Sequence, residues 1–243
     1  MCTVSFIATS NEIIITSNRD EQTLRSVALP PNEIEMQFGS LYYPIDTKAG
    51  GTWFIVSSTG NVGVLLNGAF EKHIPLSNYK RSRGEILPLI FQEENPLKAL
   101  QQLDLSGFQQ HTIILFVYKK LYQCIWDAEQ LYVKELPVSE PHIWSSITLY
   151  SAKTIALKKL AFTAFIANTF SINSANVIDF HAQLTLQNKP HLLMPTVQAT
   201  MQTVSLSSVC ISKQYINLYY QDCNTGNTYN NTVPFQTMFN KLF

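Results

Sequence analysis

The stretch of sequence that decides the fold is CTVSFIATSNEIIITSNRDE, residues 2–21. Residues 2–9 and residues 12–18 are two runs of β-branched and apolar side chains, a composition typical of strands. Ser10 and Asn11 lie between the two runs and are residues that favour a tight turn. The sequence therefore predicts an antiparallel β-hairpin at the start of the chain.

The length of the turn decides which residues of the two strands face each other. With a two-residue turn, Thr9 opposes Glu12, and counting back along both strands places Cys2 opposite Arg19. Opposed side chains project from the same face of the sheet, about 5 Å apart at Cβ. We therefore expect Cys2 and Arg19 to be neighbours and Asp20 to lie beside the chain terminus.

This pairing has a chemical use. A nearby guanidinium stabilises a thiolate, so Arg19 would make Cys2 a nucleophile. If Met1 is removed, Cys2 also carries the α-amine, which titrates near about 7.7–8.0 and suits a general base at neutral pH. Asp20 would orient that amine. The alternative, from the residues alone, is an incidental cysteine beside a solvated strand end with a weak surface ion pair.

The rest of the sequence alternates between blocks of strands and blocks of helices. Pro30 and Pro31 begin a stretch that we expect to be irregular. The expected strands are residues 51–57, 61–67, 112–118, 121–127, 131–134, 142–147, 204–212 and 215–221. The expected helices are residues 83–92, a short helix from Pro96, a helix capped by Ser151 and residues 175–184. This order predicts an α+β protein with two sheets covered by helices, and no linker divides it, so we expect one domain over residues 1–243.

The two helices of the second half differ in what their patterns indicate. The helix after Ser151 has a broad apolar face, which we expect to pack on the core; its members are Ile155, Leu157, Leu160, Phe162, Phe165 and Ile166. The second helix holds Asp179 and His181, which we interpret as a pair on the helix surface in preference to a proton relay.

Composition excludes several classes of function. Lys and Arg number 17, as do Asp and Glu, so the basic excess typical of nucleic-acid-binding proteins is absent. No apolar run is long enough to span a membrane, and the first residues lack the features of a secretory signal. The four cysteines lack CxxC spacing, so we expect reduced thiols in a cytoplasmic protein, with Cys124, Cys210 and Cys223 buried and inert. A secreted form trimmed of its signal stays open, since four is an even number.

Other polar and aromatic residues are candidates for ligand contacts. Arg25 and Arg83 would bind an acidic group, or else hydrogen-bond loop carbonyls or a carboxylate. Trp53 would line a pocket or pack in the core, and the glycines before it, Gly50 and Gly51, would permit a tight entry into a strand. The five histidines show no HxxxH or HxH spacing, so we expect no tight metal site and no cofactor.

The sequence resembles the NRDE family, which is related to the transport-and-Golgi-organisation proteins. The resemblance is specific over residues 1–84, and its motifs are Met1-Cys2-Thr3, Asn18-Arg19-Asp20-Glu21, Arg25, Pro30-Pro31, Asp46, Ala49-Gly50-Gly51-Thr52-Trp53, Leu66-Asn67 and Ser82-Arg83-Gly84. It is weaker afterwards, at Ser145-Ser146 with Leu149, Phe180-His181 and Thr203-Val204-Ser205. The family in turn resembles the cysteine N-terminal-nucleophile amidohydrolases, such as penicillin V acylases and bile salt hydrolases.

The resemblance implies a fold and a set of roles. The fold is a four-layer αββα sandwich of two mainly antiparallel sheets. Cys2 matches the nucleophile, Arg19 the arginine that contacts it, Asp20 the aspartate beside the α-amine, and Asn67 a residue of the oxyanion hole. Candidate substrate-binding residues are Asn18, Arg25, Trp53, Arg83 and Ser146. The amidohydrolases carry a second asparagine donor where this chain has Ser145-Ser146, and a late arginine, whereas this chain has no arginine after Arg83.

Two functions from different classes follow. The first is an amidohydrolase that cleaves a non-peptide carbon–nitrogen bond of a small N-acyl substrate with an apolar acyl group. The second is a non-catalytic protein on the same scaffold that binds a hydrophobic ligand, haem or lipid, because eukaryotic relatives are associated with such ligands. A purely structural protein is a third reading, and it predicts no organised site around Cys2.

Overall fold

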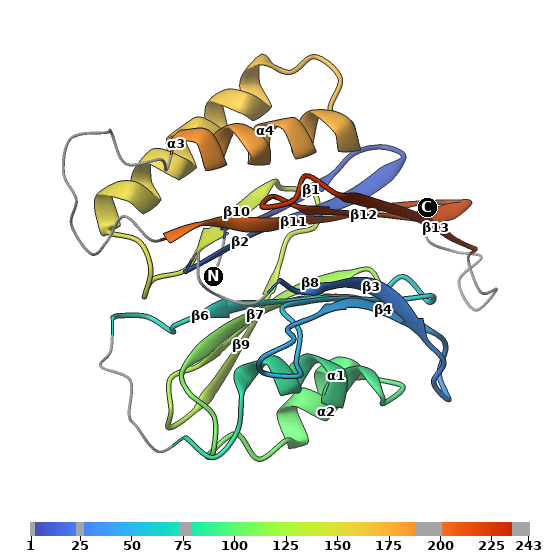
Figure 1. Cartoon of the computed structure of the whole chain (residues 1–243), viewed down its shortest axis with the longest axis vertical. Coiled ribbons are helices and arrows are strands. Elements are labelled where there is room, and N and C mark those ends of the chain that lie inside the picture. The colour runs from blue at the N-terminus through green and yellow to red at the C-terminus, as the bar shows by residue number, and fades with distance from the viewer. Residues whose placement is uncertain (1–2, 23–26, 73–78, 188–200, 235–243) are drawn as a thin grey trace.

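Two β-sheets lie face to face in the protein, and helices cover the outer face of each sheet (Figure 1). This computed structural model describes residues 3–22, 27–72, 79–187 and 201–234. The layers run helix, sheet, sheet, helix, which confirms the α+β, αββα architecture expected from the sequence.

The first sheet holds the predicted hairpin. Its order is β10-β1-β2-β11-β12-β13, and neighbouring strands are antiparallel. Thr3 pairs with Asn18 and Ala8 with Ile13, which confirms the predicted register. The pair of Cys2 with Arg19 lies outside the described residues. The strands are β1 (Thr3–Ala8), β2 (Glu12–Gln22), β10 (His142–Ser145), β11 (Met201–Ser212), β12 (Tyr215–Asp222) and β13 (Thr228–Pro234), the last of which the sequence pattern does not predict.

The second sheet is a meander whose strands follow chain order, β3 to β9. Its strands are β3 (Leu29–Ile34), β4 (Leu41–Ile45), β5 (Phe54–Ser57), β6 (Val62–Asn67), β7 (His111–Val117), β8 (Lys120–Trp126) and β9 (Leu131–Leu136). The expectation of an irregular stretch at Pro30 and Pro31 is wrong, because both lie in β3. A proline lacks an N–H group, and β3 tolerates two of them since it is an edge strand with an irregular register between Leu29 and Asn32.

The helices begin at capping residues that the sequence provides. Ser82 and Glu85 form a capping box at the 3₁₀ helix η1 (Arg83–Glu85), which leads into α1 (Ile86–Phe91). Asn95 caps α2 (Pro96–Gln102), which has Pro96 in its first turn as predicted, and the predicted cap Ser151 begins α3 (Ala152–Asn168). The last helix is α4 (Ser174–Gln187). Helices α1 and α2 cover the second sheet, and α3 and α4 cover the first (Figure 1).

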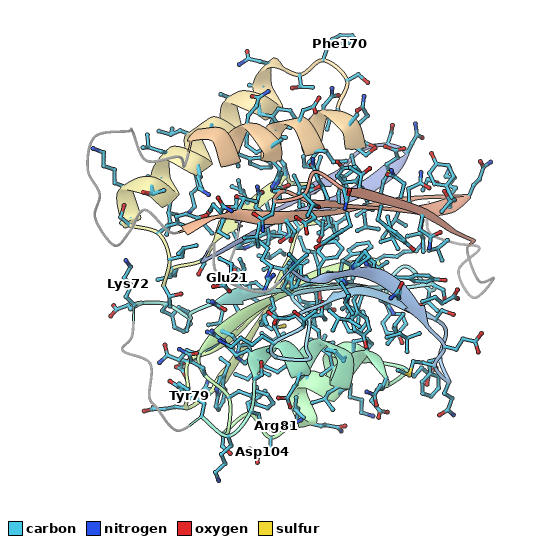
Figure 2. The ribbon with its side chains drawn as sticks, viewed as in Figure 1. Glu21, Lys72, Tyr79, Arg81, Asp104 and Phe170 are labelled. Atoms are coloured by element: carbon cyan, nitrogen blue, oxygen red, sulfur yellow. The ribbon has the colours of Figure 1, made fainter. Side chains whose placement is uncertain are left out.

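The expected broad apolar face of α3 is wrong in part. Phe162 is buried, but Leu157 and Leu160 are 57% and 67% exposed, and the buried residue between them in the helix is Lys158. The reason is the position of the helix: α4 contacts the central strands β2 and β11, while α3 contacts the sheet at its edge strand β10. Only a narrow stripe of α3 is therefore covered. Phe170, just after α3, points away from the protein (Figure 2).

The backbones of two motifs meet at Gly51 and Gly84. The N–H group of Thr52 donates a hydrogen bond to the carbonyl oxygen of Gly84 at 2.9 Å. A Cβ atom added at Gly51 would lie 2.4 Å from the carbonyl carbon of Gly84, closer than any real contact. Gly51 is therefore required by the close backbone approach, and a Cβ atom at Gly84 would make a tight contact of 3.2 Å with the Cα atom of Gly51.

Gly51→Ala is expected to lower the free energy of unfolding by about 1–3 kcal/mol, because the η1 segment must move to admit the methyl group. Denaturant titration would measure the change. Gly107→Ala is the matched control, since its added Cβ would meet the Cβ of Lys80 at an ordinary 3.5 Å. Equal stability of the two variants would contradict the prediction.

Candidate active site at the start of the first strand

The candidate site lies where β1 begins between its two neighbours. Thr3, the first described residue of β1, pairs with Asn18 on β2 and with Ser145 on β10. The next residues along those two strands are Arg19 and Ser146, and both are buried. Segments from three different parts of the chain therefore converge on the residue that follows Cys2.

Arg19 is held rigidly in the space between the two sheets. Its side chain is 2% exposed, and its Nη2 atom lies 2.5 Å from Oδ2 of Asp46 in a buried ion pair. The guanidinium carbon is 4.2 Å from the centre of the Trp53 ring. Asp46 is itself fixed, because its Oδ1 atom accepts hydrogen bonds from the backbone N–H groups of Lys48 and Ala49. A solvated strand end with a weak surface ion pair is therefore the wrong reading of Arg19.

Several buried polar atoms around Arg19 have no hydrogen-bond partner within the described part of the chain. They are Nε of Arg19 itself, Nε1 of Trp53, and the hydroxyl groups of Ser17 and Ser205, which project from the same face of the first sheet as Arg19. Oδ1 of Asn67, at the end of β6 in the other sheet, also has no such partner. Buried polar atoms in proteins are hydrogen-bonded in the great majority of cases. A set of them at one edge of the inter-sheet space is suited to receive the polar groups of a ligand.

Asp20 projects from the opposite face of β2, toward the helices. It is buried, and its carboxylate accepts hydrogen bonds from the hydroxyl groups of Tyr150 and Thr203. Lys158 of α3 lies beside this group: its Nζ atom donates to Oγ1 of Thr3 at 2.7 Å and lies 3.9 Å from the centre of the Tyr150 ring. Thr3, Asp20 and the helix layer are thus joined in one polar cluster.

His181 is part of this buried layer, and its interpretation as a surface pair with Asp179 is wrong. The side chain of His181 is 0% exposed; Nε2 lies 2.7 Å from Oγ of Ser5, and Nδ1 contacts Oδ1 of Asn18. The Asn18 amide group donates to the backbone carbonyl of His181 at 2.9 Å, which turns Oδ1 toward the ring. Burial and the charge of Lys158 lower the pKa of His181 to about 3, so the ring is neutral.

Asn67 and Ser146 lie next to each other. The hydroxyl group of Ser146 donates to the backbone carbonyl of Asn67 at 2.8 Å and also lies 3.2 Å from Oγ1 of Thr148. The Ser146 hydroxyl is therefore committed to holding the end of β6. This leaves the side-chain amide of Asn67 as the better candidate donor to a ligand.

Arg83 lies beside the same end of β6. Its Nη1 atom donates to the carbonyl oxygen of Gln110 at 3.2 Å, which agrees with the alternative of a hydrogen bond to a loop carbonyl. Burial lowers the pKa of Arg83 to about 10, against the opposing effects of Tyr79 and Glu21, so it remains charged at neutral pH. Glu21 and Tyr79 lie on the same side of the molecule (Figure 2).

Two of the predicted site residues, Cys2 and Arg25, lie outside the described residues. The thiols of Cys124 and Cys210 are buried as expected, and burial raises the pKa of each to about 12, which makes them poor nucleophiles. The expectation that Cys223 is buried is wrong, because it is a free thiol at the surface.

In the ranges that the structure describes, no group of three or more His, Cys, Asp or Glu side chains is arranged to hold a metal ion. In the same ranges, no helix has the length and apolar character needed to cross a bilayer.

The sequence does not single out Lys158 or Tyr150 as site residues, and it predicts His181 at the helix surface. All three contact the strands that carry the site. Lys158 did leave a signal, because it lies between Ile155 and Phe162 in the spacing of a buried helical stripe. A charged residue at such a position indicates a buried polar contact. Tyr150 left no comparable signal.

Comparisons with known proteins agree with the fold. The model of the family described as Transport and Golgi organisation 2 matches residues 1–233. The search of curated proteins gave no match. Among solved structures, the C2A mutant of the conjugated bile acid hydrolase from Clostridium perfringens is 11% identical, with a TM-score of 0.59 and 97% of each chain covered. The Caenorhabditis elegans orthologue of N-acylethanolamine-hydrolyzing acid amidase is 11% identical, with a TM-score of 0.61, over 85% of this chain and 92% of that one.

Proposed function

The chain belongs to the Transport and Golgi organisation 2 family and has the fold of the N-terminal nucleophile hydrolases, and on this premise we propose that it hydrolyses an amide. In the proposal, removal of Met1 exposes Cys2, whose thiolate is the nucleophile and whose α-amine is the base. The bond cleaved is a non-peptide carbon–nitrogen bond of a small N-acyl compound. The products are a carboxylic acid and an amine.

The observation that carries the proposal is the fixed, desolvated guanidinium of Arg19. Cys2 is bonded to Thr3, so its Cα atom is about 3.8 Å from that of Thr3. Thr3 pairs with Asn18, the residue before Arg19, so the guanidinium is supplied at the strand end from which Cys2 extends. Asp46 and Trp53 prevent Arg19 from turning into solvent. A cation held in this way favours the thiolate over the thiol.

The reaction follows from these groups in two stages. The α-amine takes the thiol proton as the sulfur attacks the carbonyl carbon, and returns it to the leaving nitrogen when the carbon–nitrogen bond breaks. Water then attacks the resulting thioester, with the same amine as base, and releases the acid. Asp20 is held by Tyr150 and Thr203, so its carboxylate is available as a fixed negative charge near the chain end.

The amide group of Asn67 is the proposed oxyanion donor. Ser146 positions it indirectly, by bonding to the Asn67 carbonyl. A preorganised donor of this kind typically contributes about 2.7–4 kcal/mol to the barrier reduction. The proposal thus gives Ser146 a positioning role in place of a direct contact with substrate.

The substrate class is proposed from the fold neighbours. They are named for hydrolysis of conjugated bile acids and of N-acylethanolamines. A compound with an apolar acyl group and a small amine part is the common description. Arg83 and Arg25 are proposed to contact an acidic group of the amine part where the substrate has one.

The test begins with the N-terminus and then measures turnover. Intact mass is expected to show that Met1 is absent from the purified protein. Released amine is then measured with a panel of N-acylethanolamines and conjugated bile acids. Cys2→Ala is expected to lower the rate at least about a thousandfold, as for other catalytic nucleophiles.

Cys223→Ala is the matched control, because it removes a free thiol at the surface and is expected to keep the wild-type rate. Quantitative retention of Met1 would contradict the proposal, since the base would then be an amide nitrogen. So would binding of these compounds without release of amine, which is the behaviour of a hydrophobic-ligand-binding protein.

A further inference from the structure

Lys158 is an unusual residue for its position. It lies in the middle of a surface helix, between the exposed residues Leu157 and Lys159, yet it is only 5% exposed. Burying an ammonium group is costly unless the surroundings compensate, so lysines at such positions are rare. Its contacts therefore indicate what the buried charge acts on.

The contacts of Lys158 all lead to the start of β1. Its Nζ atom donates to Oγ1 of Thr3 at 2.7 Å, across 155 residues of sequence. It also lies over the ring of Tyr150, whose hydroxyl group donates to Asp20. The lysine is thus joined through one side chain to the strand that carries the proposed nucleophile, and through another to the aspartate of the proposed site.

Covalent geometry limits how far Lys158 is from the α-amine of Cys2. Thr3 directly follows Cys2, and consecutive Cα atoms are about 3.8 Å apart. With the Nζ–Oγ1 distance of 2.7 Å, the amine nitrogen lies within roughly 10 Å of Nζ for any conformation of the first residue. At this range a positive charge disfavours a second one.

We propose that Lys158 is a positioning residue that keeps the α-amine of Cys2 in its uncharged, basic form at neutral pH. The proposal rests on the function proposed above and explains how an amine with an adjacent carboxylate still serves as a base. Like charges at about 10 Å, with an effective dielectric constant of about 20, shift a titration by on the order of one pH unit.

Other polar and charged groups on the neighbouring elements also affect the protonation of the α-amine. Asp20 on β2 acts on the amine in the opposite direction, because a carboxylate favours the protonated form. Arg19 projects from the other face of β2, where the carboxylate of Asp46 offsets its charge. His181 on α4 is neutral, since burial and the Lys158 charge lower its pKa. Tyr150 contributes its ring and its hydroxyl group. Removing the lysine charge leaves Asp20 dominant on the helix side.

The first experiment titrates the amine without requiring turnover. The protein is made to begin at residue 2 by cutting a removable tag, with Cys2→Ala to keep the amine and remove the thiol. Limited acetylation across pH, read on the N-terminal peptide by mass spectrometry, gives the apparent pKa of the amine. Lys158→Gln and Lys158→Met are expected to raise it by on the order of half to one unit. Lys158→Arg is expected to leave it unchanged.

Lys159→Met is the matched control, because it removes an exposed lysine from the same helix and is expected to have no effect. An unchanged or lowered pKa in folded Lys158→Gln would overturn the proposal. If neither neutral variant folds while Lys158→Arg does, the charge is needed for folding, and the proposal is likewise wrong.

The second experiment uses chains with Cys2 intact. The acid limb of the pH profile of kcat/KM is expected to move to higher pH in Lys158→Gln, and to return in Lys158→Arg. The amine titration separates the two proposals. If Lys158→Gln raises the pKa of the α-amine but the wild type hydrolyses none of the compounds, only the proposed amidohydrolase activity is rejected. If the wild type hydrolyses a substrate but Lys158→Gln leaves the pKa of the α-amine unchanged, only the proposed role of Lys158 is rejected.

Discussion

Replacing Arg19 by methionine is expected to lower the free energy of unfolding by about 3–5 kcal/mol. The guanidinium is 2% exposed and forms an ion pair with Asp46, so the substitution leaves a buried carboxylate without its cation. Methionine fills most of the volume against Trp53, which limits the contribution of a cavity. Denaturant titration at pH 7 measures the change, and the same variant is expected to lose the proposed hydrolysis.

A double-mutant cycle identifies the cause of this loss. Asp46→Asn keeps an acceptor for the backbone N–H groups of Lys48 and Ala49 and removes the charge. In the Arg19→Met background it is expected to cost far less than in the wild type. If the two substitutions lowered the free energy of unfolding additively, the lost ion pair would not be the cause of the destabilisation.

Arg81→Met is the surface control for the same chemistry. Arg81, just before the capping residue Ser82, pairs with Glu85 at 3.1 Å, but both side chains are about two-fifths exposed. Exposed pairs of this kind contribute about 0–1 kcal/mol, so a small change is expected. If Arg19→Met and Arg81→Met lowered the free energy of unfolding by similar amounts, burial would not determine how much these ion pairs contribute to stability.

The features that sequence alone predicts here are those set by local rules. The register of the first hairpin follows from a two-residue turn and strand alternation, and it holds from Thr3 to Ala8. The caps at Ser82 and Ser151 are also local, because each side chain bonds within its own first turn. The position of Arg19 beside the start of β1 follows from the same register.

The sequence predicts the edge strands β9 and β10 but not the edge strands β3 and β13, nor the short interior strand β4. The residues of β3 and β13 do not by themselves define a strand. β3 begins with Leu29 and two prolines, and β13 contains Tyr229 and two asparagines, which are weak strand signals. Both are strands because a neighbour pairs with them, β4 in one case and β12 in the other. Polar and proline-containing edges are also what prevents sheets from pairing with other chains.

The buried polar layer could not be predicted, because its contacts join distant segments. Lys158 meets Thr3, His181 meets Ser5, and Thr203 meets Asp20, each across more than 150 residues. No periodicity or residue spacing in the sequence predicts such pairs. A polar residue inside an apolar helical stripe is the remaining signal, and it indicates burial without naming the partner.

The second large effect is expected in acid, where His181 makes the fold sensitive to pH. The pKa of His181 is lowered to about 3 in the folded chain, from an ordinary value of 6.5, by burial first and by Lys158 second. Below pH 6.5 the unfolded chain binds a proton at this histidine that the folded chain does not. Stability from His181 is therefore complete above pH 6.5 and falls by about 1.4 kcal/mol per pH unit as the pH drops toward 3. His111, whose pKa burial lowers to about 4, adds a similar slope down to that value.

His181→Gln is expected to be less stable than the wild type at pH 7, because it loses contacts with Ser5 and Asn18. It is also expected to lose about 2 kcal/mol less between pH 6.5 and pH 5, since glutamine does not titrate. Denaturant titrations at closely spaced pH values measure both effects. The wild type, titrated alongside, gives the reference slope. If His181→Gln kept that slope, His181 would have to be charged in the folded protein. The hydrogen bond from its Nδ1 to Asn18 would then hold an imidazolium beside Lys158, and the polar layer behind the candidate site would carry two positive charges where we infer one.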